Sequence, residues 1–227
     1  MNDKALAERV KLRKAFVRLL TCAALLAMLL CQFGCVSEPF DARVQSLSER
    51  NESFAEARRI LGKPEINTPD EIRQAVDRLN NALEREQSGL DKSVIQTALA
   101  QIYLIVLRDC HEAKRHSSAA VSLDPDSARA LEIDVSSDFC FAGATGDYDP
   151  IIERMEKLAE QGRYFRLLYS LMGNAYMIRS NQTNAQADLL KAKSAFLKAR
   201  ERGEPQASPN ALGLSIEELE RRLKRTQ

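Results

Sequence analysis

The sequence predicts an all-α protein, and three observations lead to this fold class. Glycine is scarce, with nine among 227 residues, tryptophan is absent, and alanine, leucine, arginine and glutamate are abundant. These four side chains lose little freedom in a helix. Runs of β-branched residues that would form strands are missing. Apolar and small residues also recur at helical spacing in paired segments, and prolines follow two of these pairs.

The first element is an N-terminal leader. Residues 1–34 hold six Lys or Arg against two Asp or Glu, whereas the rest of the chain holds 27 against 30. The basic start precedes an apolar stretch, 19–36, whose 18 residues are the lower limit for crossing a bilayer. Three interpretations are left open. The segment is a cleaved signal of a lipidated protein, a cleaved signal of a secreted protein, or an uncleaved membrane anchor. The mildly acidic body gives no electrostatic reason to expect nucleic-acid binding.

The end of the leader favours the lipid-anchored interpretation. Gly34 is a small residue of the kind signal peptidases need, and Cys35 follows at once. These two residues resemble the lipobox of bacterial lipoproteins, although Gln32 and Phe33 depart from its usual residues. The resemblance implies a signal peptide at 1–34, a diacylglycerol group on Cys35, and a tether at 35–42. Val36 stands where Asp would imply inner-membrane retention, so the resemblance implies an outer-membrane anchor facing the periplasm.

Two cysteines remain available for pairing once the leader is removed. The chain has five, and cleavage removes two while lipidation uses Cys35. Cys110 and Cys140 remain, an even pair in an oxidising compartment. They either form a disulfide that closes a loop of about 30 residues or stay as two buried thiols.

The body, 43–224, begins with two helices that form a first pair. The second of them carries Ala75, Leu79 and Ala82 on one face. Its start is well signalled, because Thr68 is a capping residue, Pro69 suits the first helical position and Glu71 completes a capping box.

The second pair, over 94–126, is the clearest. Leu99, Ala100 and Tyr103 share one face of its first helix. Ala113, Ser117 and Ala120 share one face of its second helix, before Pro125 stops the chain. Small residues at this spacing let two helices approach closely, so the segment predicts an αα-hairpin.

The same order of residues recurs near the C-terminus. Tyr169, Gly173 and Tyr176 precede a helix with Ala192, Phe196 and Ala199, and Pro205 follows. Residues 146–161 resemble the second helix of another pair. This order resembles the tetratricopeptide repeat. The resemblance implies an α-solenoid of about four helix pairs, closed by a capping helix from Ser215. A compact helical bundle is the alternative.

Motifs for catalysis or metal binding are weak. His111 and His116 lie five residues apart, which turns the two rings about 140° from each other on a helix and removes the zinc-protease geometry. We interpret this segment as a solvated helix face, and the carboxylates of DPDSARALEID, 124–134, as hydrated surface. No nucleophile elbow or phosphate-binding loop appears. We therefore expect no enzyme activity, no cofactor and no metal.

The expected function is binding. In stacked helix pairs the first helices line a concave groove, and here these would be 43–61, 91–107, 127–140 and 164–180. Their polar members are Gln96, Gln101, Arg108, Arg166, Asn174 and Arg179. We expect a non-catalytic scaffold that binds an envelope protein or peptide. The alternatives are an accessory component of a solute transporter and a cell-wall hydrolase.

Overall fold

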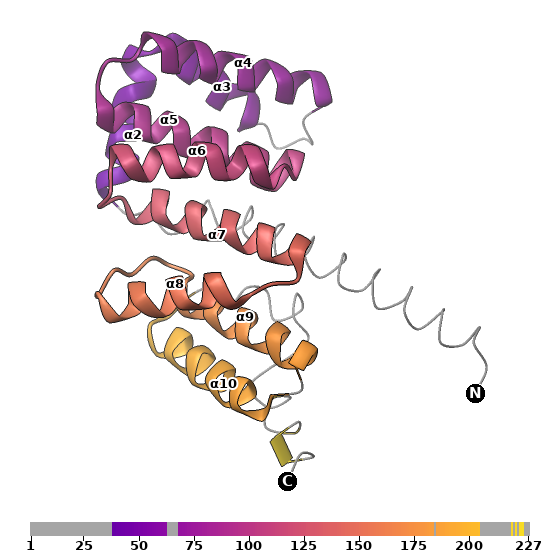
Figure 1. Ribbon diagram of the computed structural model, residues 1–227. Helices are drawn as coiled ribbons and strands as arrows, with labels where there is room; N and C mark the ends of the chain where they lie inside the picture. The colour runs from indigo at the N-terminus through magenta and orange to yellow at the C-terminus, as the bar shows by residue number, and fades with distance from the viewer. Residues whose placement is uncertain are drawn as a thin grey trace, which may run out of the picture. The chain divides into compact units, whose positions relative to one another are not determined.

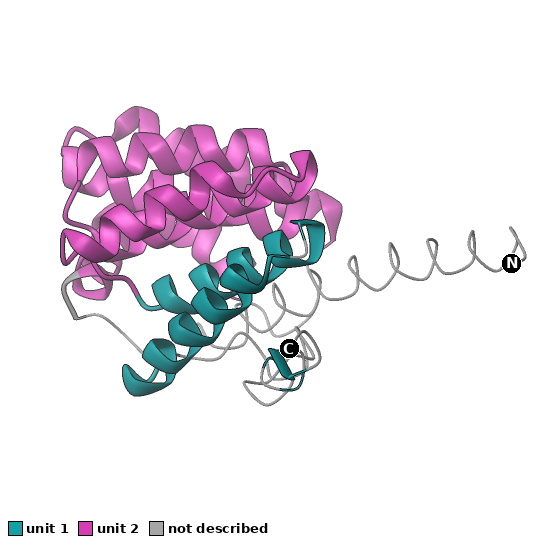
Figure 2. Cartoon of the chain, turned by 60° about the horizontal axis from the view of Figure 1, so that its bottom comes forward, with its two compact units in different colours: residues 1–35, 166–227 teal, residues 36–165 magenta. Residues whose placement is uncertain are grey.

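The computed structural model describes residues 38–62, 68–183 and 185–204, together with 219, 221, 223 and 224. These residues lie in helices, turns and short connections, and none is in a strand, so the predicted all-α class is confirmed. The chain divides into two compact units, which are described separately: unit 2 holds 36–165, and unit 1 holds 1–35 and 166–227 (Figure 2). The predicted signal peptide, Cys35 and residues 36 and 37 of the tether lie outside the described residues.

The helices follow one another with short connections. Unit 2 contains α2 (Glu38–Arg50), α3 (Glu52–Leu61), α4 (Pro69–Arg85), α5 (Gly89–Gln101), the π-helix η1 (Ile102–Leu107), α6 (Cys110–Leu123), α7 (Ala128–Thr145) and α8 (Asp149–Glu160). Unit 1 contains α9 (Leu168–Thr183) and α10 (Gln186–Glu201). Of the predicted terminal helix the structure describes four residues, all helical, and among them Leu219 is buried.

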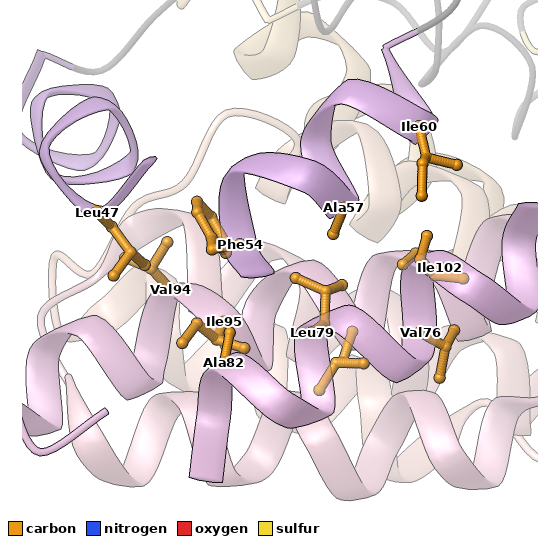
Figure 3. Close-up of a cluster of buried hydrophobic side chains, with 12 residues drawn as sticks. Leu47, Phe54, Ala57, Ile60, Val76, Leu79, Ala82, Val94, Ile95 and Ile102 are labelled. Atoms are coloured by element: carbon orange, nitrogen blue, oxygen red, sulfur yellow. The ribbon is translucent and has the colours of Figure 1, made fainter. Parts of the chain in front are cut away.

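In unit 2 each helix packs on its neighbour in the chain, as Figure 1 shows for α3 to α8. The apolar faces of α2, α3, α4 and α5 meet in one core cluster (Figure 3). Phe54, Leu79 and Ile95 are at most 2% exposed within it. Burying each of these side chains contributes roughly 1.5–3 kcal/mol, so this cluster is the main source of stability in the first half of unit 2.

The first predicted helix, 43–61, is wrong as a single element. It is broken at Asn51, whose backbone is extended (φ −121°, ψ 98°) and whose Oδ1 accepts a hydrogen bond from the Phe54 N–H at 3.1 Å. Asn is a favoured N-cap because its side chain pairs an otherwise unbonded N–H of the first turn. The helix before the break also starts earlier than expected, at Glu38, so most of the predicted tether is helical. Pro39 fits there because the first turn needs no donor from it.

The predicted start of α4 is confirmed. The Thr68 Oγ1 accepts from the Glu71 N–H at 3.3 Å, and the Glu71 carboxylate accepts from the Thr68 N–H at 2.8 Å. This reciprocal pair is a capping box, and Pro69 occupies the first helical position. Ala75, Leu79 and Ala82 then face the core, as their spacing predicts.

The second predicted pair consists of α5 with η1, and α6. Leu99, Ala100, Ala113 and Ala120 are all fully buried, so the small residues do lie where helices meet. The chain leaves η1 through Arg108, a left-handed residue (φ 57°), and α6 ends before Pro125. A π-helix accommodates an extra residue, which gives α5 and η1 an irregularity that the sequence pattern did not predict.

In unit 1, α9 and α10 pack against each other. Gly173 lies so close to Phe196 that a Cβ atom there would be 2.8 Å from the ring carbons Cε1 and Cζ. Ala192 and Ala199 are buried on the same side of α10. The absence of a side chain at Gly173 therefore sets the close approach of these two helices.

Candidate functional site

The predicted groove residues are divided between the two units. Gln96 lies on α5 and Gln101 ends that helix, both in unit 2. Unit 1 holds Arg166, just before α9, and Asn174 and Arg179 on α9. The structure therefore gives two separate polar sites, and we treat each one on its own.

Two of these residues share an unusual environment. The Nε2 of Gln101 and the Oδ1 of Asn174 are the buried side-chain polar atoms that have no hydrogen-bond partner within the described chain. Asn174 as a whole is only 5% exposed. A buried amide atom without a partner costs about 1–3 kcal/mol, and native proteins tolerate few of them. These two atoms are therefore the places where the described chain leaves the hydrogen-bonding capacity of a buried side chain unused.

The two amides also occupy the same place in their helix pairs. Gln101 directly follows the buried Ala100, and Asn174 directly follows Gly173. Each amide is followed two residues later by a tyrosine, Tyr103 or Tyr176. Two helices with different neighbours thus present an unsatisfied amide at the same register.

Gln96 is engaged inside the protein. Its Oε1 lies 2.6 Å from the Nδ1 of His116, and Arg115 approaches the Nε2 of the same ring at 2.8 Å. A guanidinium can only donate hydrogen bonds, so the Nε2 of His116 is the acceptor. The proton of the neutral ring is therefore on Nδ1, which donates a hydrogen bond to the Oε1 of Gln96. The imidazole also stacks on the Tyr103 ring, with centroids 5.3 Å apart. Gln96 thus holds a neutral histidine in one tautomer.

The interpretation of 111–116 as a solvated helix face is wrong for His116. His111 is exposed, but the His116 side chain is 2% exposed and lies between α5 and α6. Burial, followed by the charge of Arg115, lowers the pKa of His116 to about 4, which Glu112 only partly offsets. At neutral pH this ring is therefore a packed, uncharged group.

The cations predicted for the groove are also engaged. Arg179 donates from Nε and Nη2 to the two carboxylate oxygens of Asp188 at 2.8 and 2.6 Å, and its guanidinium lies over the Tyr176 ring. Arg166 is half-buried, and Arg108, the left-handed residue after η1, is exposed. A bidentate pair of this geometry fixes the arginine fork. Arg179 is thus a structural cation between α9 and α10.

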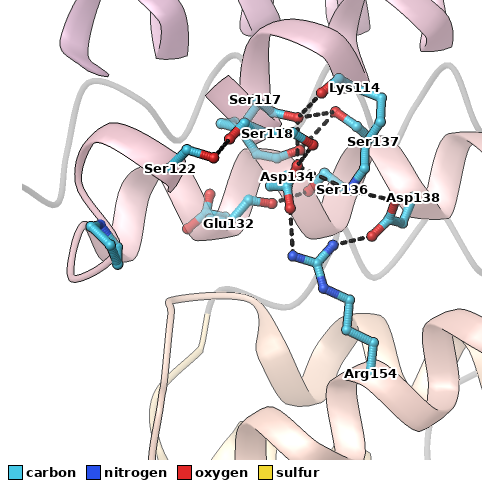
Figure 4. Close-up of polar contacts among 12 residues, drawn as sticks. Lys114, Ser117, Ser118, Ser122, Glu132, Asp134, Ser136, Ser137, Asp138 and Arg154 are labelled. Atoms are coloured by element: carbon cyan, nitrogen blue, oxygen red, sulfur yellow. Dashed lines mark hydrogen bonds and ion pairs between the residues drawn. The ribbon is translucent and has the colours of Figure 1, made fainter. Parts of the chain in front are cut away.

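A polar network that the sequence did not reveal joins α6, α7 and α8 (Figure 4). At its centre Asp134, 3% exposed, accepts hydrogen bonds from Ser117 at 2.8 Å and from Lys114 and Ser118 at 3.0 Å. Arg154 of α8 donates to Asp134 and also to Asp138. Burial by itself raises the pKa of Asp134, but the charges of Lys114 and Arg154 outweigh burial and leave that pKa below its ordinary value.

The prediction of hydrated carboxylates over 124–134 is therefore wrong at two positions. Glu132 is 5% exposed and paired with Arg129, and Asp134 is the centre of the network. All residues from Ala130 to Ser137 are buried. Buried carboxylates are stable only when paired and hydrogen-bonded, and each of these has its cation. The network connects three helices, and its saturation with partners makes it a structural feature rather than a binding site.

In unit 1 the buried carboxylate of Glu204 lies at the start of α9. Glu204 follows α10 and accepts hydrogen bonds from the N–H groups of Tyr169 and Ser170, at 3.2 and 2.9 Å, and from the Ser170 hydroxyl at 3.1 Å. It therefore caps the first turn of α9, where N–H groups lack partners in the helix. Burial raises the pKa of Glu204, and the three hydrogen bonds and Arg202 act against that rise.

Cys110 and Cys140 are joined by a disulfide in the structure, with Cα atoms 5.8 Å apart. Cys110 begins α6 and Cys140 lies near the end of α7. The bond therefore ties two packed helices near one end. Next to it, the ring of His111 meets Phe141 edge to face.

Metal ligands and membrane-spanning helices are the remaining features to consider in the described ranges. No group of three His, Cys, Asp or Glu is placed to hold a metal ion within the described ranges. In the same part of the chain, Gly89–Leu107 is long and apolar enough to cross a bilayer, but more than half of it is buried, and residues such as Ile95 and Leu99 lie in the core of unit 2. We therefore interpret α5 and η1 as a core segment.

Comparison of the chain with protein-family models, with curated proteins and with solved structures found no match.

Proposed function

We propose that this chain is a lipid-anchored envelope protein that binds a protein or peptide partner through tetratricopeptide-like helix pairs and performs no catalysis. The observation that carries the binding role is the pair of unsatisfied amides, Gln101 and Asn174, at one register of two helix pairs. A peptide backbone offers both an N–H and a C=O group, so it can pair with either amide atom.

The solenoid part of the proposal draws on packing. Small residues lie at the helix contacts of both pairs, with Ala113 and Ala120 in one, and Gly173, Ala192 and Ala199 in the other. Stacked pairs of this kind expose their first helices on one concave face. Gln101 and Asn174 both belong to first helices, α5 and α9.

The location outside the cytoplasm draws on the leader and the cysteines. The leader ends on Gly34–Cys35, which resembles a lipobox, and a disulfide between Cys110 and Cys140 is favoured in an oxidising compartment. An acyl anchor contributes roughly 0.8 kcal/mol per buried methylene, so two or three chains hold a protein stably at a bilayer.

The binding role is tested by comparing captured partners. Wild-type protein, the double variant Gln101→Ala/Asn174→Ala and the control Gln74→Ala/Asn81→Ala are purified from the same envelope fraction. The control removes two amides that are exposed on α4. We expect a partner that the wild type and the control retain equally and that the double variant retains at least about tenfold less, the equivalent of 1.4 kcal/mol. Equal retention by all three folded proteins contradicts the proposal.

The anchor is tested by the intact mass of protein extracted from membranes. The expected mass is that of a chain starting at Cys35 plus the acyl groups, and Cys35→Ser is expected to abolish both the cleavage and the lipid. An unlipidated 227-residue chain contradicts this part of the proposal, and it leaves the partner experiment unaffected.

A further inference from the structure

The outer face of α10 has a regular distribution of apolar and basic residues. Leu190 is 55% exposed, the highest value among the large apolar side chains described, and Ser194 and partly exposed Leu197 follow it. At about 100° per residue these three positions fall within about 60° of one another on the helix. They form a narrow outer stripe, opposite the face on which Ala192 and Ala199 meet α9.

Cations lie on both sides of this stripe. With the same spacing per residue, Lys191, Lys198 and Arg202 lie on one flank, and Lys193 and Arg200 lie on the other. The cations of the first flank lie over tyrosine rings of α9. Lys191 lies 5.1 Å from the centroid of the Tyr176 ring, and Lys198 and Arg202 lie 5.5 and 5.8 Å from that of Tyr169.

Basic residues outnumber acidic residues in this part of the chain. Residues 166–204 hold seven Lys or Arg and three Asp or Glu, a net charge of +4. Asp188 is buried in its pair with Arg179, and Glu204 is buried at the start of α9. Glu201 is the one acidic side chain of α10 that is exposed. By contrast, residues 36–165 hold 16 Lys or Arg and 24 Asp or Glu, a net charge of −8.

A helix with apolar residues between two rows of cations is suited to a bilayer surface. The apolar stripe enters the boundary between headgroups and acyl chains, while Lys and Arg extend their charged ends to the phosphates. The flanking cations also favour anionic over zwitterionic lipid.

We propose that α10 is a second membrane contact, which lies on an anionic phospholipid surface through Leu190 and Leu197 with the flanking cations on the headgroups. This inference rests on the proposed attachment of the chain to a membrane, because that attachment keeps α10 at high effective concentration near lipid. An alternative occupant, the acidic region of a second copy, is an outcome of the test.

The chain contains no tryptophan, so a single introduced indole reports on its own surroundings. The full-length chain carrying Leu190→Trp is reconstituted into vesicles of phosphatidylcholine alone or of phosphatidylcholine with phosphatidylglycerol, and each set is repeated with brominated lipid as quencher. Leu90→Trp is the matched control, since Leu90 is 43% exposed on α5 in the acidic unit.

We expect the emission of Leu190→Trp to shift to the blue and to be quenched by brominated lipid in the anionic vesicles. Both effects are expected to fall severalfold in 1 M salt, where the Debye length is about 3 Å, and in the variant that adds Lys198→Gln and Arg200→Gln. Leu90→Trp is expected to be unquenched throughout.

Three results overturn the proposal. One is no quenching at Leu190→Trp while flotation shows the chain bound to the vesicles. Another is equal quenching in both lipid compositions. The third is a blue shift that needs no vesicles and grows with protein concentration, which identifies a second copy as the occupant. Flotation of the vesicles reports attachment and partner capture reports groove binding, so failure of either is distinguished from failure of this contact.

Discussion

The close approach of α9 and α10 predicts a specific coupling between Gly173 and Phe196. In Gly173→Ala the new Cβ would lie 2.8 Å from two ring carbons of Phe196 and 2.9 Å from a third, distances that require the ring to move. Overpacking of this kind costs about 1–3 kcal/mol. The same substitution removes a glycine from a helix interior, which stabilises by about 1 kcal/mol. The single variant is therefore expected to lose between nothing and about 2 kcal/mol.

A double-mutant cycle separates the two effects. In the Phe196→Leu background the ring is gone, so Gly173→Ala keeps the helix gain without the clash and is expected to stabilise by up to about 1 kcal/mol. Because Phe196 is only half-buried, its ring can shift outward. We therefore expect a coupling free energy in the lower part of the range, about 1–2 kcal/mol.

Urea unfolding followed by circular dichroism gives the four free energies, and hydrogen exchange of α9 and α10 shows whether the change is local. Gly143→Ala on α7 is the control, because the nearest atom to its added Cβ is the Tyr148 hydroxyl at an ordinary 3.6 Å. The control is expected to stabilise in both backgrounds equally. A coupling below about 0.5 kcal/mol lies within the usual error of additivity and would refute the claim that Gly173 sets the helix spacing.

Three other expectations follow from unit 2. The pKa of His116, lowered to about 4, means that the unfolded chain binds more protons between pH 6.5 and 4, so stability falls by up to about 3 kcal/mol as the pH drops through that window. Urea midpoints at pH 7.5 and 4.5 measure this, and His116→Gln should remove it while His111→Gln should not. Asp134→Asn is expected to cost about 3–5 kcal/mol in the same assay, because two cations lose a buried partner; a loss as small as that of a surface charge contradicts the network. Reduction of the bond between Cys110 and Cys140 is expected to cost roughly 3–4 kcal/mol, and an unchanged midpoint in reductant would count against it.

Local signals in the sequence predict local structure well here. The start of α4 was predictable because Thr68, Pro69 and Glu71 are adjacent and each acts on the same helical turn. The break at Asn51 also has a local cause. Asn is a favoured N-cap, and its side chain accepts a hydrogen bond from the Phe54 N–H in the first turn of α3. The sequence nevertheless predicts one helix over 43–61, because the apolar periodicity continues through Asn51.

The polar interior was not predictable from the sequence, because burial depends on neighbours from other helices. Asp134 looks like a surface carboxylate until α6 and α8 cover it and supply Lys114 and Arg154. His116 looks like a solvated residue until Gln96 of α5 and Tyr103 of η1 contact its ring. The run from Ala130 to Ser137 contains four polar residues among eight, so its complete burial is not visible in the sequence, and the need of Asp134 for a charged partner follows only from that burial.

The two kinds of buried polar group in this protein are energetically opposite, and the difference separates structure from function. The carboxylate of Asp134 accepts hydrogen bonds from several donors, among them Lys114 and Ser117. Its removal leaves buried cations without that partner and destabilises the fold. The Oδ1 of Asn174 has no partner in the described part of the chain, so folding gains nothing from that oxygen. The variant Asn174→Leu, which places an apolar side chain of similar size there, is therefore expected to unfold at the same or a higher urea concentration than the wild type. The same variant is expected to lose binding of the partner. Under the proposed function, the amide of Asn174 lowers stability and contributes to partner binding, and a destabilised Asn174→Leu that still binds would contradict both parts of this expectation.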